Sequence, residues 1–226
     1  MTAKDVTRIL IVEDHPIFRI GLGELINQES DLTVCGEAED IGKAWEKIRK
    51  LDPDMVIVDI SLKGRNGLEL IHQINSYGKD LPVLVLSMHD ETLYAQRALR
   101  AGAKGYIMKK DASESVVKAI RSVLDGKIYV SEKVIGNILE TLSGQAQTQD
   151  ESIVEKLADR ELEVFQFIGQ GTSTKEIAEK LSLSVKTIGT YRERIKEKLN
   201  LRHTNELIRH AVHWVENEGL ETDPEE

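Results

Sequence analysis

The chain has 226 residues, of which 31% are charged, and its formal net charge at pH 7 is −9. This length suits two small domains, and no apolar stretch approaches the length of a membrane span. The start lacks a signal-peptide pattern. A single cysteine, Cys35, excludes a disulfide framework and a cysteine-based zinc site. We therefore expect a two-domain cytoplasmic protein without a membrane partner.

The first 125 residues alternate short apolar strands with amphipathic helices. The pattern predicts strands over residues 9–12, 32–36, 55–58, 83–86 and 105–108. It predicts helices over residues 17–28, 41–51, 68–76, 92–100 and 113–124. Five strand–helix units favour an α/β fold with a parallel sheet covered on both faces, in a flavodoxin-like (βα)5 order. No glycine-rich phosphate loop follows a strand, which counts against dinucleotide or NTP binding.

Polar residues stand at the ends of four of these strands. Glu13 and Asp14 follow the first strand and Asp59 the third, while Ser87 and Lys109 follow the fourth and fifth. Because the carboxyl ends of parallel strands meet at one sheet edge, we expect these side chains to lie together. Asp14 and Asp59 suit direct ligation of Mg²⁺, with Glu13 holding a metal-bound water. Each carboxylate alone is better explained as a turn or cap residue, so the prediction depends on the whole set.

The same set suits a phosphoryl group. Asp59 as a nucleophile would form an acyl phosphate, as carboxylates do in other proteins. Lys109 would supply a positive charge to the phosphoryl group, and Ser87 would donate a hydrogen bond to it. A phosphoryl group adds almost two negative charges at one spot, enough to bias an element that has two near-degenerate arrangements.

Residues 4–125 resemble a CheY-type receiver domain, the phosphoacceptor half of two-component signalling, through Glu13, Asp14, Asp59, Ser87 and Lys109. The resemblance implies that Asp59 takes phosphate from a sensor histidine kinase. It implies that Mg²⁺ is the cofactor and that the backbone carbonyl of Ser61 is a further metal ligand. It also implies a conformational switch formed by Ser87 and Tyr106, in which both side chains move inward after phosphorylation.

Beyond residue 126 the strand–helix alternation stops. We predict a helix over 131–142 with Ser131 as its N-cap, a flexible polar linker over 143–150, and four helices over 159–168, 174–181, 185–199 and 204–215. Two helices on a short turn, with Ser184 as the cap of the second, predict a helix-turn-helix. The expected domains are a receiver at 1–125, a linker with one helix at 126–152, a four-helix DNA-binding domain at 153–215 and an acidic tail at 216–226.

The helix over 185–199 is the predicted reading helix. Val185, Ile188, Ile195 and Leu199 share one face, which we expect to pack inward. The other side offers groups for base edges and phosphates. The candidates for DNA contact are Lys186, Thr187, Gly189, Thr190, Glu193, Arg194, Lys196 and Lys198. Any single one of them is better explained as solvated helix surface, and Glu193 is equally explained as an intrahelical partner.

Residues 157–215 resemble the LuxR-type helix-turn-helix of the NarL/FixJ response regulators, in the stretches 160–164, 175–178 and 184–188 and at Ile195, Lys198 and Leu199. The resemblance implies binding to double-stranded DNA, with 204–215 as the dimer helix, and leaves RNA polymerase open as a further partner. We expect the homodimer to form on phosphorylation. Residues 153–214 hold 11 Lys and Arg against 9 Asp and Glu, a weak basic footprint. We therefore expect dimerisation to supply much of the affinity for DNA.

The expected function is a transcriptional response regulator that is switched by phosphorylation of Asp59. Beyond self-phosphorylation from a donor and autodephosphorylation, no enzymatic activity is expected. One alternative is a phosphorylation-independent DNA-binding regulator whose receiver is only a dimerisation scaffold. Another is a phosphohydrolase with an aspartyl nucleophile. Enzymes of the haloacid-dehalogenase type carry a second aspartate two residues after the nucleophile, where this chain has Ser61.

Overall fold

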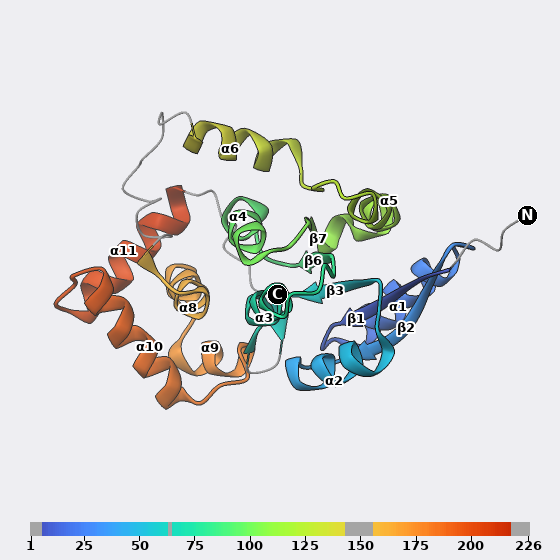
Figure 1. Ribbon diagram of the computed structural model, residues 1–226. Coiled ribbons are helices and arrows are strands. Elements are labelled where there is room, and N and C mark those ends of the chain that lie inside the picture. Colours follow the sequence, from blue (N-terminus) through green and yellow to red (C-terminus); the bar gives the residue numbers. More distant parts are fainter. Residues whose placement is uncertain (1–5, 63–64, 143–155, 218–226) are drawn as a thin grey trace, which may run out of the picture. The chain divides into compact units, whose positions relative to one another are not determined.

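The computed structural model describes residues 6–62, 65–142 and 156–217 (Figure 1). The chain divides into two compact units, Met1–Leu139 and Glu140–Glu226. The linker predicted over 143–150 and most of the predicted acidic tail lie outside the described residues, and the boundaries of the four predicted segments stay a prediction. No helix in the described part of the chain is long and apolar enough to cross a membrane.

The first unit is built on a five-stranded parallel sheet in the order β2-β1-β3-β6-β7. The strands are β1 (Thr7–Val12), β2 (Leu32–Ala38), β3 (Met55–Asp59), β6 (Val83–Ser87) and β7 (Gly105–Met108). The helices are α1 (Pro16–Asn27), α2 (Ile41–Leu51), α3 (Gly67–Ser76), α4 (Glu91–Ala101) and α5 (Ala112–Leu124). This is the flavodoxin-like order, so the predicted fold class is confirmed.

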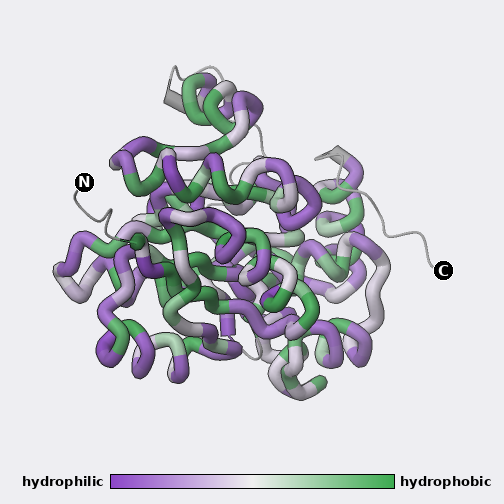
Figure 2. The backbone as a smooth tube through the Cα atoms, turned by 90° about the vertical axis from the view of Figure 1, so that its right-hand side faces the viewer, coloured by the Kyte–Doolittle hydropathy of each residue, from purple (hydrophilic) through white to green (hydrophobic). Residues whose placement is uncertain are grey.

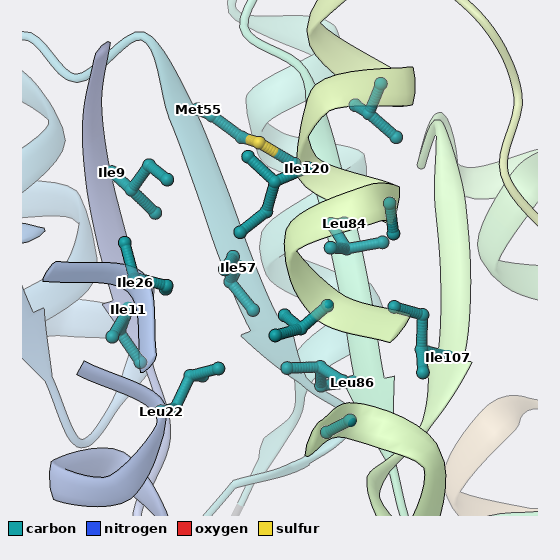
Figure 3. Packing of buried hydrophobic residues seen from close by; sticks show 14 of the residues in the cluster. Ile9, Ile11, Leu22, Ile26, Met55, Ile57, Leu84, Leu86, Ile107 and Ile120 are labelled. Carbon is teal, nitrogen blue, oxygen red and sulfur yellow. The ribbon is translucent and has the colours of Figure 1, made fainter. Parts of the chain in front are cut away.

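Successive residues of each strand point to opposite faces of the sheet, and both faces are covered. On one face α1 and α5 pack on the strands, as Figure 3 shows for Leu22, Ile26, Ile57 and Ile120. On the other face lie α2, α3 and α4 (Figure 1). Along the helices hydrophobic and hydrophilic residues alternate, as expected for helices with one face on a core (Figure 2).

Three helices of this unit begin at side-chain caps in the loops that follow the strands. Asp40, Asn66 and Asp90 each accept a hydrogen bond from a backbone N–H in the first turn of the helix that follows, at 2.8, 2.9 and 2.8 Å. Such caps satisfy amides that have no partner within the helix. They also fix where α2, α3 and α4 begin relative to the strand ends.

Two short elements were not predicted from the sequence. An antiparallel hairpin of β4 (Ser61–Leu62) and β5 (Arg65–Asn66) connects β3 to α3, and a single 3₁₀ turn, η1 (Lys109–Asp111), connects β7 to α5. Elements of two or three residues are too short to carry a periodic pattern, so sequence periodicity does not predict them.

The chain leaves the sheet through a single bridge beside β7. The backbone N–H of Tyr106 donates to the carbonyl of Tyr129 at 2.8 Å. Ser131 then caps α6 (Glu132–Leu142), as predicted, and its hydroxyl also donates to Glu91 Oε1 at 2.8 Å. The start of α6 is therefore hydrogen-bonded to the first turn of α4, and the segment before it to β7.

The described part of the second unit consists of the helices α8 (Asp159–Gly169), α9 (Thr174–Lys180), α10 (Val185–Lys198) and α11 (Thr204–Asn217). Its core includes the rings of Phe165 and Trp214, both 0% exposed, with centroids 5.5 Å apart. A Cβ on Gly169 would lie 2.4 Å from the Ala211 carbonyl, so the close approach of α8 and α11 requires a glycine. The four predicted helices are confirmed.

Candidate functional site

The strand register brings the predicted polar residues together at the carboxyl edge of the sheet. Asp59 is paired with Leu86 on β6, which places Ser87 one residue further along this edge. Ser87 is paired in turn with Met108 on β7, so Lys109 follows there. The acidic pair follows β1, which borders β3 on the other side. We call this group, made up of Glu13, Asp14, Asp59, Ser87 and Lys109, the Asp59 site.

The side chains of the Asp59 site are buried, and a lysine bridges two of its carboxylates. Asp59 and Glu13 are each 2% exposed and Lys109 is 8% exposed. Lys109 Nζ lies 2.8 Å from Asp59 Oδ2 and 2.7 Å from Glu13 Oε2. The same Nζ lies 4.7 Å from the centre of the Phe18 ring, within range of a cation–π contact.

Burial and charge act on this pair in opposite directions. Burial raises the pKa of Asp59, although the ammonium of Lys109 opposes the shift. Burial alone would lower the pKa of Lys109, but the carboxylates of Asp59 and Glu13 outweigh it, and the pKa is raised. Lys109 therefore stays positively charged and is the main partner for negative charge at Asp59.

The donor atoms of the Asp59 site fit a divalent cation. Asp59 Oδ1 is buried and has no hydrogen-bond partner among the described residues, a costly condition that a bound cation would relieve. Glu13, Asp14, His15 and Asp59 each offer a ligand atom, and these atoms lie within 4.8 Å of one another. Three carboxylates against one ammonium leave an excess of negative charge, and oxygen donors are what Mg²⁺ prefers.

Gly67 positions Asp59, and reasoning from the sequence missed it. A Cβ at Gly67 would lie only 2.0 Å from the Asp59 carbonyl oxygen, so no other residue fits here without a backbone shift. The Gly67 N–H also donates to the Ile60 carbonyl at 2.7 Å. The Asn-Gly pair formed with Asn66, just before an apolar helical stretch, was the signal that could have indicated a tight turn here.

Ser87 and Tyr106 are held by the same peptide segment. Ser87 Oγ accepts a hydrogen bond from the His89 N–H at 3.1 Å, and the Tyr106 hydroxyl donates to the His89 carbonyl at 2.8 Å. Tyr106 is 2% exposed, and burial raises the pKa of its hydroxyl. The His89 ring is within hydrogen-bond distance of Ser61 Oγ, at 2.8 Å, and stacks on Tyr94. The segments that follow β3 and β6 are therefore hydrogen-bonded to each other, and no sequence pattern predicted this contact.

In the second unit, α9 and α10 form the predicted helix-turn-helix. Ser173 and Glu176 make a reciprocal capping box at the start of α9: the Glu176 N–H donates to Ser173 Oγ at 3.3 Å, and the Ser173 N–H donates to Glu176 Oε2 at 2.8 Å. The turn includes Ser182 at a φ of 52°. Ser184 caps α10 as predicted, accepting from the Thr187 N–H at 3.0 Å.

The inward face of α10 is narrower than predicted. Ile188 and Ile195 are 0% exposed, and Leu199 is half-buried. Val185 is 52% exposed, so the prediction that it packs inward is wrong. Three residues of helix rotate Val185 about 60° away from Ile188, and Val185 stands in the first turn, so it falls at the border of the buried stripe.

The predicted DNA contacts are spread over the rest of α10. Those that are exposed are Lys186, Thr190, Glu193, Arg194 and Lys198, and those that are half-buried are Thr187, Gly189 and Lys196. Lys196 Nζ lies 2.9 Å from Glu193 Oε2, and Lys198 Nζ donates to the buried Glu161 Oε2 at 2.6 Å. The side chains of Lys186 and Arg194 make no hydrogen bond or ion pair within the described ranges.

Comparison with known proteins identifies the family of each unit. Residues 9–121 match the family model of the response regulator receiver domain, and residues 155–211 match that of bacterial regulatory proteins of the luxR family. The oxygen regulatory protein NreC of Staphylococcus epidermidis is 35% identical over 210 residues, covering 91% of this chain and 96% of that protein. A putative transcriptional regulator of Pseudomonas aeruginosa is 34% identical over 203 residues, covering 90% of this chain and 96% of that protein.

A solved structure is similar over both units. RcsB of Salmonella enterica serovar Typhimurium, bound to promoter rprA in the presence of phosphomimetic BeF₃⁻, is 26% identical with a TM-score of 0.60, covering 92% of this chain and 99% of that one. The resemblances to a receiver and to a LuxR-type helix-turn-helix are thus confirmed. The chain belongs to the LuxR family of two-component response regulators, which makes it a DNA-binding regulator of transcription.

Proposed function

We propose that Asp59 is the phosphoacceptor of this regulator, that a sensor histidine kinase supplies the phosphoryl group, and that phosphorylation controls DNA binding by α10. The proposal rests mainly on the surroundings of Asp59, where Lys109 Nζ holds Oδ2 at 2.8 Å while Oδ1 is buried with no hydrogen-bond partner in the described part of the chain. A carboxylate oxygen of Asp59 forms the bond to phosphorus as the bond from phosphorus to the kinase histidine breaks. Hydrolysis of this acyl phosphate is the only other reaction that we assign to the chain.

The residues that we assign to Mg²⁺ are Glu13, Asp14 and Asp59, with the backbone carbonyl of Ser61. When bound there, Mg²⁺ neutralises negative charge on the carboxylates and on the oxygens of the phosphoryl group. Lys109 supplies a second positive charge, which its buried position strengthens. The Ser87 hydroxyl donates a hydrogen bond to the phosphoryl group.

The switch that we propose starts at Ser87. Its hydroxyl now accepts a hydrogen bond from the His89 N–H, and a phosphoryl group on Asp59 offers it a charged acceptor instead. When Ser87 turns towards that acceptor, the loop that holds the Tyr106 hydroxyl moves, and Tyr106 follows inward. Because the Tyr106 N–H is bonded to Tyr129, the change reaches the segment that leads into α6.

DNA contact is assigned to Lys186, Thr187, Gly189, Thr190, Glu193, Arg194, Lys196 and Lys198. Lys186 and Arg194 are the strongest candidates, because neither side chain is engaged by a described residue. Lys198 has a second role, since it neutralises the buried Glu161. RcsB has been solved as two dimers bound to two parallel DNAs. We propose that this chain likewise binds double-stranded DNA as a homodimer, on half-sites about one helical turn apart, and that RNA polymerase is a further partner.

Phosphorylation-dependent DNA binding tests the proposal. Duplexes that bind the protein are selected from a random pool, and their affinity is measured by fluorescence anisotropy with and without acetyl phosphate and Mg²⁺. We expect the donor to strengthen binding of the wild type roughly 5- to 150-fold, the usual range of allosteric coupling. We expect no effect of the donor on Asp59→Asn.

Two results would contradict the proposal. Equal DNA affinity of the wild type and Asp59→Asn, each with and without acetyl phosphate, would support a phosphorylation-independent regulator with the receiver as a scaffold. Repeated turnover of p-nitrophenyl phosphate by the wild type, absent from Asp59→Asn, would support a phosphohydrolase.

A further inference from the structure

A histidine stands directly after the acidic pair of the Asp59 site and faces it. His15 Nδ1 lies 2.9 Å from Asp14 Oδ1 and 3.0 Å from Glu13 Oε1. His15 occupies the N-cap position of α1, but its side chain makes no capping hydrogen bond to the helix. The side chain is 68% exposed, so packing does not force the ring onto the carboxylates.

Lys109 contacts one carboxylate oxygen of Glu13 and one of Asp59 and leaves the other oxygen of each available to other partners. Its Nζ binds Oε2 of Glu13 and Oδ2 of Asp59, at 2.7 and 2.8 Å. The second oxygen of Glu13 faces His15, and the second oxygen of Asp59 is buried without a hydrogen-bond partner in the described residues. Together with Asp14, these residues offer one nitrogen and three oxygen atoms within 4.8 Å of one another.

Two distances within this group match those between neighbouring ligands of one ion. Bonds of about 2.0–2.2 Å to nitrogen and carboxylate oxygen, at angles near 90–110°, put neighbouring ligand atoms about 2.8–3.6 Å apart. The distances from His15 Nδ1 to Asp14 and Glu13 lie within this range. An ion could therefore bind between these side chains with only small movements of them.

We propose that His15 is a nitrogen ligand of the Asp59 site, and that the unphosphorylated site therefore binds a first-row transition ion, such as Mn²⁺, Ni²⁺ or Zn²⁺, more tightly than Mg²⁺. Mg²⁺ is bound through oxygen and gains little from an imidazole, whereas the affinity of nitrogen ligands rises from Mn²⁺ to Ni²⁺. His15 then determines which ion occupies the site when a phosphoryl donor arrives. The inference uses the metal site of the proposed function but does not depend on phosphoryl transfer.

Metal affinity of the whole chain provides the first test. Ni²⁺ and Mg²⁺ are titrated by calorimetry into the wild type, His15→Gln, His72→Gln and Asp14→Asn, with thermal unfolding as the check that each variant is folded. His72 is a matched control, since it is an exposed histidine on α3. We expect His15→Gln to weaken Ni²⁺ binding roughly tenfold or more and to leave Mg²⁺ binding unchanged. His72→Gln should behave as the wild type, and Asp14→Asn should lose both ions.

Pulsed electron paramagnetic resonance of the Mn²⁺-loaded chain gives a direct readout of the ligand. We expect modulation from an imidazole nitrogen in the wild type and none in His15→Gln. A persisting nitrogen signal, or equal weakening of Ni²⁺ and Mg²⁺, would overturn the inference and leave His15 as a hydrogen-bond partner of the carboxylates. Failure of the wild type to take up phosphate on Asp59 with Mg²⁺ would instead overturn the proposed function, whatever the result for His15.

Discussion

The Asp59 site and the exposed side of α10 are built in opposite ways. The Asp59 site gathers buried side chains from the ends of four strands, and Lys109 joins two of its carboxylates at distances below 3 Å. The candidates on α10 follow one another along a single helix and mostly face solvent. A substitution in the buried site therefore changes stability together with function, because its charges depend on one another. On α10 the two effects can be separated, because the partner lies outside the fold.

The largest effect is expected for Lys109→Met. This change leaves the carboxylates of Glu13 and Asp59 buried without their common cation, which costs roughly 3–5 kcal/mol of unfolding free energy. Urea unfolding measures the loss, and added Mg²⁺ should recover part of it. Lys110→Met is the matched control, since Lys110 is the next residue along the chain and is exposed. Equal stability of the two variants would show that the buried charges are not coupled as described.

A smaller loss of stability is expected for Gly67→Ala. The added Cβ meets the Asp59 carbonyl, a backbone atom that cannot rotate away, so we expect a loss of roughly 1–3 kcal/mol in unfolding free energy. Phosphoryl uptake on Asp59, measured by intact mass, should fall as well. In Gly21→Ala the new Cβ meets nothing within 4 Å, so uptake should match the wild type. Full uptake by Gly67→Ala would contradict the tight positioning of Asp59.

Gly189→Ala should separate stability from function on α10. A Cβ here meets nothing within 4 Å, and alanine in a helix interior is favoured over glycine by about 0.8–1.0 kcal/mol. We therefore expect unfolding free energy to rise while DNA affinity falls, because the methyl group would stand in the proposed DNA interface. Gly136→Ala on α6 is the matched control for helix propensity without a DNA contact. A gain in stability with unchanged DNA affinity would remove Gly189 from the interface.

The smallest effect is expected at the capping box of α9. Hydrogen bonds from Ser173 lower the pKa of Glu176 below that of an ordinary glutamate. Its stabilising contribution is therefore present above the ordinary pKa and is lost as pH falls through the lowered one. Glu176→Gln should lower the melting temperature slightly at pH 7, and the difference from the wild type should vanish in acid. Glu179→Gln, in an exposed pair with Lys175, should have no measurable effect at either pH.

Most of the Asp59 site could be predicted because parallel strands impose a common edge. Once Asp59 and Lys109 are placed at strand ends, the sheet order brings them together without further information. The approach of Gly67 to the Asp59 carbonyl could not be predicted, since it depends on a hairpin too short to show a pattern. The hydrogen bond between the Ser61 and His89 side chains joins two segments that are distant in sequence, and a periodic pattern cannot predict such a contact.

On α10 the buried stripe was predicted too wide. Periodicity placed Val185 with Ile188 and Ile195, but burial in the first turn of a helix also depends on which neighbours reach it. The pairing of Lys198 with Glu161 was missed for a related reason, since Glu161 belongs to α8. The sequence pattern therefore located the predicted reading helix. Whether each lysine or arginine on it is paired with another part of the fold could be seen only in the folded domain.

We propose that phosphorylation of Asp59 promotes the dimerisation on which DNA binding depends, and one experiment tests this directly. The wild type and Asp59→Asn are incubated with acetyl phosphate and Mg²⁺, and intact mass and sedimentation velocity are recorded on the same samples. We expect one added phosphoryl group and a shift from monomer towards dimer for the wild type alone. Uptake by Asp59→Asn to the same extent, no uptake by the wild type, or uptake by the wild type without a shift towards dimer would contradict the account.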